Sequence, residues 1–379
     1  MDENTITDEL VLGFTRARFG DKLHDKRCRS VAYGVLGVIY GDELTVSGVG
    51  RGLARAREKS PKHCIKQVDR LLSNDDVPMD IFFAGWVPWL LGDRESIVAA
   101  LDWTEHAHDA QSTIALFLVT RHGRATPMIW KTVDSKSLKD NRNRHEDELL
   151  AAFTHHIPPD LKVTILADRG FGDVAFYDVL DELGFDYVVR FRSCIEVRLR
   201  NGNVSAAAEL VAPNGRARSY VDVELTAKRR KTPAIVTVRD DRMKEAWCLA
   251  TSLKQPAQQV VELYGRRFTI EETFRDTKDA HFGLGLSQTH IGRPIRRDRL
   301  LMLAAMAHAL LTLLGRAGES VGLDRQLRAN TVKRRTHSLF RQGREYIRAR
   351  ISGHLKALHH AFLSLLQHQP HVSDRYAWI

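Results

Sequence analysis

Cysteine is scarce in this chain, and the few cysteines lie far apart. The sequence of 379 residues has four of them: Cys28, Cys64, Cys194 and Cys248. None forms a CxxC pair or has the spacing of a zinc site. This distribution argues against a disulfide-stapled secreted domain and against a structural zinc module. It predicts free thiols in a reducing cytoplasm.

Features of membrane proteins are also missing. The N-terminal residues, MDENTITDEL, are acidic and polar, which is unlike a signal peptide. The most apolar run, Leu300 to Leu314, is about fifteen residues long and contains His308. A membrane-spanning helix needs about 20 apolar residues. We therefore expect a buried helix at this run and no membrane partner.

Positive charge is in excess. The 57 lysine and arginine residues outnumber the 47 aspartate and glutamate residues, which gives a formal charge of +10. Such a balance suits a polyanion such as DNA, although a basic ribosomal or membrane-surface protein shares its sign. Segment 61–74 has the pattern of a basic amphipathic helix, and further basic residues precede it at 51–59. This pattern favours DNA contact over an ordinary surface helix of a bundle.

The pattern of apolar and polar residues changes along the chain. Residues 1–95 have helical patterns, whereas 96–192 contain three short apolar runs followed by strand–helix units. This order predicts a mixed α/β sheet and matches a ribonuclease-H-like core. Residues 193–253 contain short alternating strands separated by glycine and proline. Helical patterns resume near residue 254 and continue to the end.

Two aspartates end predicted apolar strands. Asp102 follows the run IVAAL and Asp168 follows VTIL. A single aspartate at such a place usually caps a turn, but two of them together with Glu271 on a basic helix face are better explained as a shared cation site. Carboxylate oxygens suit Mg²⁺. Two such ions about 3.5–4 Å apart can clamp the attacking and leaving oxygens of a displacement at phosphorus.

One predicted helix carries an unusual polar face. Tyr264, Arg267, Glu271 and Lys278 are three, four and seven positions apart, so they fall within roughly 60° of arc on a helix. A carboxylate among cations on one face suggests a site for metal and phosphate. The alternative is a solvated face with ion pairs, which is a common pattern.

The pattern Tyr264-x2-Arg267-x3-Glu271-x6-Lys278 resembles the signature of insertion-sequence transposases of the IS-four family, which includes the Tn-ten and Tn-five transposases. The surrounding YGRRFTIEETFRDTKDAHFGLGL is most similar to the Tn-ten branch. ALDWTEH resembles the first catalytic segment of this family and ILADRGFGD the second. PKHCIKQVDRLLSN resembles its N-terminal domain, and ANTVKRRTHSLFRQG its C-terminal part.

The resemblance implies a fold and an activity. It implies a helical N-terminal DNA-binding domain (1–95), a ribonuclease-H-like core in two parts (96–192 and 254–325), a β-rich insertion between them (193–253) and a helical C-terminal region (326–379). The implied activity is that of a DDE transposase, which cleaves insertion-sequence ends and transfers the cut strands through a hairpin intermediate. Asp102, Asp168 and Glu271 would be the catalytic residues and would bind two Mg²⁺ ions, for which Mn²⁺ could substitute.

The resemblance also implies contacts with DNA. Tyr264, Arg267 and Lys278 match residues that hold phosphates near the transposon end. Arg190 matches a phosphate-contacting arginine, and Trp247 matches a tryptophan that stacks on a flipped base. The spacer from Trp247 to Tyr264 is shorter than in the Tn-five branch, so a tryptophan on a sheet face or in the core is the alternative.

Arg192 would assist the neighbouring arginine. The implied partners are double-stranded DNA, as transposon ends and as target, and a second copy of the chain in a homodimer. The implied location is the bacterial cytoplasm, in association with the nucleoid.

Two other classes of function compete with a transposase. One is a different enzyme on the same core, such as a structure-specific nuclease or a resolvase. The signature set and the β-rich insertion argue against it. The other is a DNA-binding protein that descends from a transposase and has lost catalysis. The presence of all three carboxylates argues against that alternative.

Overall fold

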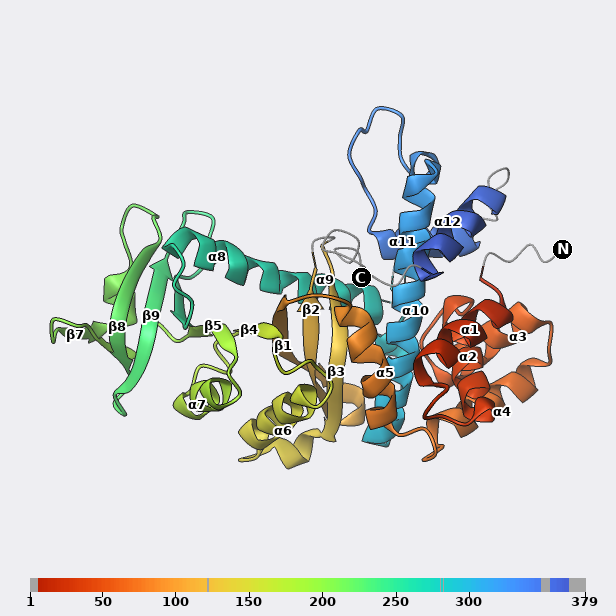
Figure 1. Ribbon diagram of the computed structural model, residues 1–379, viewed down its shortest axis with the longest axis horizontal. Coiled ribbons are helices and arrows are strands. Elements are labelled where there is room, and N and C mark those ends of the chain that lie inside the picture. Colours follow the sequence, from red (N-terminus) through yellow and green to blue (C-terminus); the bar gives the residue numbers. More distant parts are fainter. Residues whose placement is uncertain (1–5, 121–122, 280, 282, 349–354, 368–379) are drawn as a thin grey trace.

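A ten-stranded sheet runs through the computed structural model, which describes residues 6–120, 123–279, 281, 283–348 and 355–367 (Figure 1). The strand order is β3-β2-β1-β4-β5-β10-β9-β8-β6-β7. The strands are β1 (Ser96–His106), β2 (Gln111–Val119), β3 (Ala125–Asp134), β4 (Lys162–Ala167), β5 (Asp186–Phe191), β6 (Glu196–Arg198), β7 (Val204–Ala206), β8 (Arg218–Leu225), β9 (Arg230–Val238) and β10 (Trp247–Thr251).

Helices flank the sheet and extend beyond one end of it, so the mixed α/β class expected from the sequence is confirmed (Figure 1). The helices are α1 (Asp8–Phe19), α2 (Asp25–Ile39), α3 (Val46–Arg57), α4 (Pro61–Leu72), α5 (Met79–Leu91), α6 (Arg142–Thr154), α7 (Val174–Glu182), α8 (Ala257–Gly265), α9 (Thr269–Lys278), α10 (Pro294–Ser320), α11 (Leu339–Arg348) and α12 (Leu355–Gln367). Parts of the predicted C-terminal region, 349–354 and 368–379, lie outside the described residues.

The sheet combines two pairing patterns. β1, β2 and β3 form an antiparallel meander, while β4 and β5 pair in parallel with β1 and with each other. β10 then pairs antiparallel with β5, and β9 with β10. The β-rich segment 193–253 therefore continues the same sheet, because its last strand extends the core directly at β5. β2 is buried at eight of its nine positions, and its second half, Ile114 to Val119, is an unbroken apolar run.

The N-terminal helices follow their local sequence signals. The Thr45 hydroxyl caps α3 by accepting a hydrogen bond from the Gly48 N–H at 2.9 Å. Pro61 occupies the first turn of α4, where its missing N–H costs nothing. Along α4, Cys64, Val68, Leu71 and Leu72 are buried and Ile65 is partly buried, while the lysines and arginine are exposed. Residues 61–72 therefore form the amphipathic helix that the sequence predicted.

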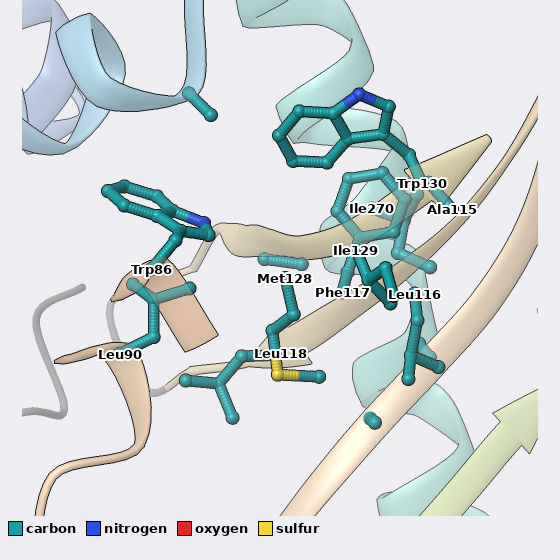
Figure 2. Packing of buried hydrophobic residues seen from close by; sticks show 14 of the residues in the cluster. Trp86, Leu90, Ala115, Leu116, Phe117, Leu118, Met128, Ile129, Trp130 and Ile270 are labelled. Carbon is teal, nitrogen blue, oxygen red and sulfur yellow. The ribbon is translucent and has the colours of Figure 1, made fainter. Parts of the chain in front are cut away.

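An aromatic-rich core joins the N-terminal helices to the sheet. α5 contributes Trp86 and Leu90, which pack toward Met128 and Trp130 of β3 (Figure 2). The Trp86 indole N–H donates a hydrogen bond to the Pro127 carbonyl at 2.9 Å. This bond satisfies the polar atom of a fully buried tryptophan and fixes α5 against β3.

The longest helix, α10, lies between the sheet and the N-terminal helices and packs against β3, α2, α11 and α12 (Figure 1). It contains the apolar run Leu300 to Leu314, so the predicted buried helix is confirmed. The run of about fifteen residues is too short to cross a membrane, but the complete helix of 27 residues is long and apolar enough to do so. Its most apolar stretch is 89% buried inside the protein, which is the environment of a core helix.

Asp298, in the first turns of α10, is buried against the sheet. Its carboxylate accepts a hydrogen bond from the Thr132 backbone N–H at 2.9 Å. Burial raises the pKa of Asp298 to about 7, even though that hydrogen bond and Arg297 lower it. The folded chain therefore holds the proton more tightly than the unfolded chain does. The contribution of Asp298 to stability is fully present below the unfolded pKa of 3.8 and is lost as the pH rises through 7.

We expect Asp298→Asn to stabilise the protein at pH 8 by roughly 1–3 kcal/mol and to stabilise it clearly less at pH 5. The amide keeps an oxygen to accept from Thr132 and carries no charge. Urea unfolding of both proteins at the two pH values measures the difference. An equal effect at pH 5 and pH 8 would show that the carboxylate is not protonated in the folded chain.

Candidate functional site

Asp102 and Asp168 lie side by side at the centre of the sheet. β1 and β4 pair in parallel, and the last pair in their register is Leu101 with Ala167. The next residue of each strand is an aspartate. The side chain of Asp102 is 18% exposed and that of Asp168 is 40% exposed, so both carboxylates reach solvent from an otherwise buried part of the sheet.

The position of Asp102 corrects one expectation. The sequence predicted that it ends a strand, but β1 continues to His106. The reason is β2, which pairs antiparallel with β1 from Ala99 to His106 and supplies hydrogen-bond partners along that whole length. Asp168 does follow the end of its strand, as predicted.

The Arg267 guanidinium bridges the two aspartates. Its Nη2 lies 3.0 Å from an Asp102 oxygen and 3.8 Å from an Asp168 oxygen. The arginine side chain is 8% exposed, and its buried Nε has no hydrogen-bond partner among the described residues. One cation therefore offsets part of the repulsion between two carboxylates at the least solvated point of the site.

The negative charge of the carboxylates at this site exceeds the positive charge of Arg267. Burial raises the pKa of Asp102 to about 6, Arg267 opposes that change, and Asp168 and Glu271 add to it. The site therefore holds more negative charge than Arg267 neutralises. An additional cation would lower the energy of the ionised carboxylates.

Backbone groups orient the two carboxylates. The Trp103 N–H donates a hydrogen bond to one oxygen of Asp102 at 2.9 Å. The Gly170 N–H donates to one oxygen of Asp168 at 2.8 Å. A Cβ at residue 170 would lie 3.0 Å from that same oxygen, so glycine is the residue that fits there. In each carboxylate the other oxygen faces Arg267.

The signature residues do not share one regular helix, which corrects the prediction. Tyr264 belongs to α8, Arg267 to a 3-10 turn (Arg266–Phe268), and Glu271 and Lys278 to α9. The backbone remains helical throughout, but the N–H of Thr269 bonds both to the third and to the second preceding carbonyl, which tightens the turn. A 3-10 segment inside a helix changes the direction of the following side chains and often marks a functional site.

Glu271 lies near this aspartate pair but is exposed, and its influence on Asp102 is electrostatic. Within the described part of the chain, no three His, Cys, Asp or Glu side chains are gathered closely enough to hold a metal ion. Three carboxylates repel one another, and Arg267 forms ion pairs only with the two on the sheet. The predicted convergence of all three therefore stays a prediction.

The other two signature side chains are more buried than a surface DNA contact needs. Tyr264 is 1% exposed, and burial raises its pKa to about 12. Lys278 is half-buried with its ammonium 5.3 Å from the Phe274 ring. Burial lowers the pKa of Lys278, while Asp102 and Glu105 raise it. Their predicted phosphate contacts remain predictions.

Trp247 is part of an aromatic cluster beside α8. Its ring meets Tyr264 edge to face at 5.0 Å and stacks on Phe268 at 5.7 Å with an interplanar angle of 25°. Phe268 is 39% exposed, which is uncommon for a phenylalanine. Phe268 was not among the residues predicted from the sequence, although an aromatic residue directly after Arg267, among polar neighbours, is a signal for it.

Arg190 and Arg192 lie where β5 ends. Arg190 donates hydrogen bonds to Glu245 at 2.7 Å and to the Ala246 carbonyl, and Arg192 is exposed. Glu245 also accepts from Arg169 at 2.9 Å. Arg169 and Glu245 were not predicted from the sequence, because only the pairing of β5 with β10 brings the segment before β10 to this place.

The helical N-terminal part has a basic surface of its own. Lys62, Lys66 and Arg70 of α4 are exposed. In the preceding helix, Arg51 and Arg55 are also exposed but pair with acidic residues of the α2–α3 loop at 2.9 and 2.7 Å. The free positive charge of this surface therefore comes mostly from α4.

A comparison with protein families finds one match. Residues 130–310 match the model of the transposase DDE domain. The matched segment contains Asp168, Arg267 and Glu271, while Asp102 precedes it. No curated protein matches the chain. The match indicates a DDE transposase, an enzyme that cleaves DNA and transfers strands, and such enzymes generally use divalent metal ions such as Mg²⁺.

Proposed function

We propose that this DDE transposase cleaves the ends of its own insertion sequence and joins them to target DNA by a cut-and-paste route through a hairpin intermediate. The observation that supports this proposal most directly is the aspartate pair at the centre of the sheet, held against one buried arginine. An IS-four identity, close to the Tn-ten branch, is part of the proposal and comes from the Tyr264–Lys278 signature.

The proposed architecture follows from the same identity. β1 to β5 with α6 to α10 would form a ribonuclease-H-like core, and 193–253 would be an insertion that lengthens its sheet. We keep the predicted divisions at 1–95, 96–192, 193–253, 254–325 and 326–379. A homodimer acting on two DNA ends, in the cytoplasm and on the nucleoid, completes the proposal.

The residues present fit a divalent cation. Asp102, Asp168 and Glu271 offer the oxygen donors that Mg²⁺ prefers, and Arg267 is the one cation that pairs with the two aspartates among the described residues. We propose two ions, for which Mn²⁺ can substitute. When bound there, Mg²⁺ would lower the pKa of an attacking water or 3′-hydroxyl and offset charge on the leaving oxygen.

The protein supplies the remaining functions of the site. Asp102 and Asp168 are fixed by backbone hydrogen bonds, so they reach the reacting phosphate in a set orientation. Arg267 bridges them and places positive charge beside them. The proposed DNA contacts of Tyr264, Lys278, Arg190, Arg192 and Trp247 would hold the strand at this point. No side chain is required as a covalent nucleophile.

The test is cleavage of the DNA that flanks the gene. A transposase predicts inverted repeats there, bordered by short direct repeats. We expect purified protein to cut a duplex carrying such an end in Mg²⁺, to leave a scrambled duplex intact, and to lose cleavage in EDTA while retaining binding. Gel analysis of end-labelled strands identifies nicked, hairpin and joined products.

The rival functions give different results in this assay. A structure-specific nuclease or a resolvase would cut branched or crossover substrates and would not prefer the repeats. A DNA-binding descendant would bind the ends and cut nothing in any metal. Either result would overturn the proposed function.

A further inference from the structure

A cavity rich in positive charge lies beside the aspartate pair. It has a volume of about 520 Å³, which is within the range of roughly 300–1,000 Å³ for ligand sites. Five of its lining side chains are cationic: Arg169, Arg190, Arg192, Arg239 and Lys244. This cavity is called the basic cavity below.

The sheet brings these residues together from distant parts of the sequence. Arg169 directly follows Asp168, so the cavity begins next to the candidate active site. Arg190 and Arg192 lie at the end of β5. The segment that joins β9 to β10, residues 239–246, passes this end because Leu249 of β10 pairs with Arg190.

One carboxylate, Glu245, lies among the five cations that line the cavity. It accepts hydrogen bonds from Arg190 at 2.7 Å and from Arg169 at 2.9 Å. Within the described part of the chain, Arg192, Arg239 and Lys244 form no ion pair. Five cations and one carboxylate leave the lining with four unbalanced positive charges.

The ion pairs of Glu245 are easily exchanged. The Glu245 side chain is 56% exposed and that of Arg169 is 54% exposed, while that of Arg190 is 18% exposed. Exposed ion pairs contribute little to stability and are screened by solvent. A phosphate group presents oxygens to arginine much as a carboxylate does and carries its charge into the same cavity. Phosphate can therefore replace Glu245 without disrupting the fold.

We propose that the basic cavity binds the phosphodiester backbone of a DNA strand next to the active site, and that Glu245 is an internal competitor which that strand displaces from Arg169 and Arg190. This inference rests on the proposed function, because it places the strand beside Asp168. Glu245 would keep the arginines positioned before DNA binds. It would also weaken the binding of strands that cannot reach the whole cavity.

A cysteine allows occupancy to be measured without catalysis. Cys194 lines the basic cavity and is exposed, whereas Cys28, Cys64 and Cys248 are buried. The rate at which iodoacetamide alkylates Cys194 in the full-length folded protein therefore reports access to the cavity. The probe is a short oligothymidylate, and EDTA is present so that no strand is cut.

We expect the oligothymidylate to protect Cys194, and Glu245→Gln to bind it more tightly by roughly twofold to fivefold, the scale set by weak exposed ion pairs. Arg239→Gln should weaken protection. The matched control is Glu224→Gln, which removes the same charge from β8, where Glu224 faces Arg198 and Arg229 at 3.8 Å outside the cavity. This control should change the affinity little.

Three results would overturn the inference: no protection of Cys194, equal effects of Glu245→Gln and Glu224→Gln, or protection by poly-glutamate that equals or exceeds that by oligothymidylate. The last result would mark a site for an acidic peptide. Because binding is measured in EDTA with a sequence-independent probe, a failure of end-specific cleavage would leave this measurement unaffected. The two proposals can therefore fail separately.

Discussion

Asp102→Asn is expected to abolish cleavage of the insertion-sequence end while leaving DNA binding unchanged. The asparagine oxygen can still accept the Trp103 hydrogen bond, so the strand should keep its geometry. The lost group is the charge that would bind the divalent cation beside the reacting phosphate. Removal of one such electrostatic contribution typically lowers the rate by about 10²–10³-fold, and a metal ligand should cost at least that much. Single-turnover cleavage with labelled ends measures the loss.

Asp102→Asn should fold as well as the parent protein, for an electrostatic reason. Burial raises the pKa of Asp102, so the ionised carboxylate destabilises the folded protein above about pH 6. A neutral side chain removes that cost, and we expect Asp102→Asn to be at least as stable as the parent protein at pH 8. Asp134→Asn, at the exposed end of β3, is the matched control. Cleavage by Asp102→Asn within a few-fold of the parent rate would show that Asp102 is not catalytic.

Local patterns in the sequence were sufficient to predict most of the elements. The apolar runs before Asp102 and Asp168 predicted β1 and β4, and the α4 pattern predicted its buried and exposed faces. Local patterns were also sufficient to select the aspartates, because a carboxylate after a buried strand has no apolar reason to be there. The extension of β1 to His106 was not predictable in this way, since it depends on its pairing with β2.

The contacts around the aspartates depend on long-range geometry. The register of β1 with β4 places Asp102 beside Asp168, and no local signal specifies that register. The 3-10 turn at Arg267 was also missed, because the helical spacing of the signature assumes a uniform 3.6-residue period. The basic cavity needs the β5–β10 pairing, which joins Arg190 to a segment about 50 residues later in the sequence. Such features follow from topology, which single-sequence patterns do not contain.

Trp247→Ala is expected to nick the transposon end at a normal rate and then to accumulate nicked DNA, because hairpin closure needs a sharply bent end. Stacking one base on an indole offsets part of the unstacking cost of that bend. Base–aromatic stacking is worth about 1–3 kcal/mol, or roughly tenfold to over a hundredfold in rate if it is realised only at that step. Quantifying nicked and hairpin strands over time measures this difference.

The packing of Trp247 determines the control for this experiment. Its ring contacts Tyr264 and stacks on Phe268, so truncation to alanine also removes buried contacts from α8. Trp247→Phe keeps an aromatic face and should retain most hairpin formation, and a pre-cut end should be joined to target DNA at a near-parental rate by both variants. If Trp247→Ala instead loses nicking, joining and solubility together, Trp247 packs the sheet against α8 and does not stack on a base. Exposed Phe268, which shares the stack, would then be the aromatic side chain available to DNA.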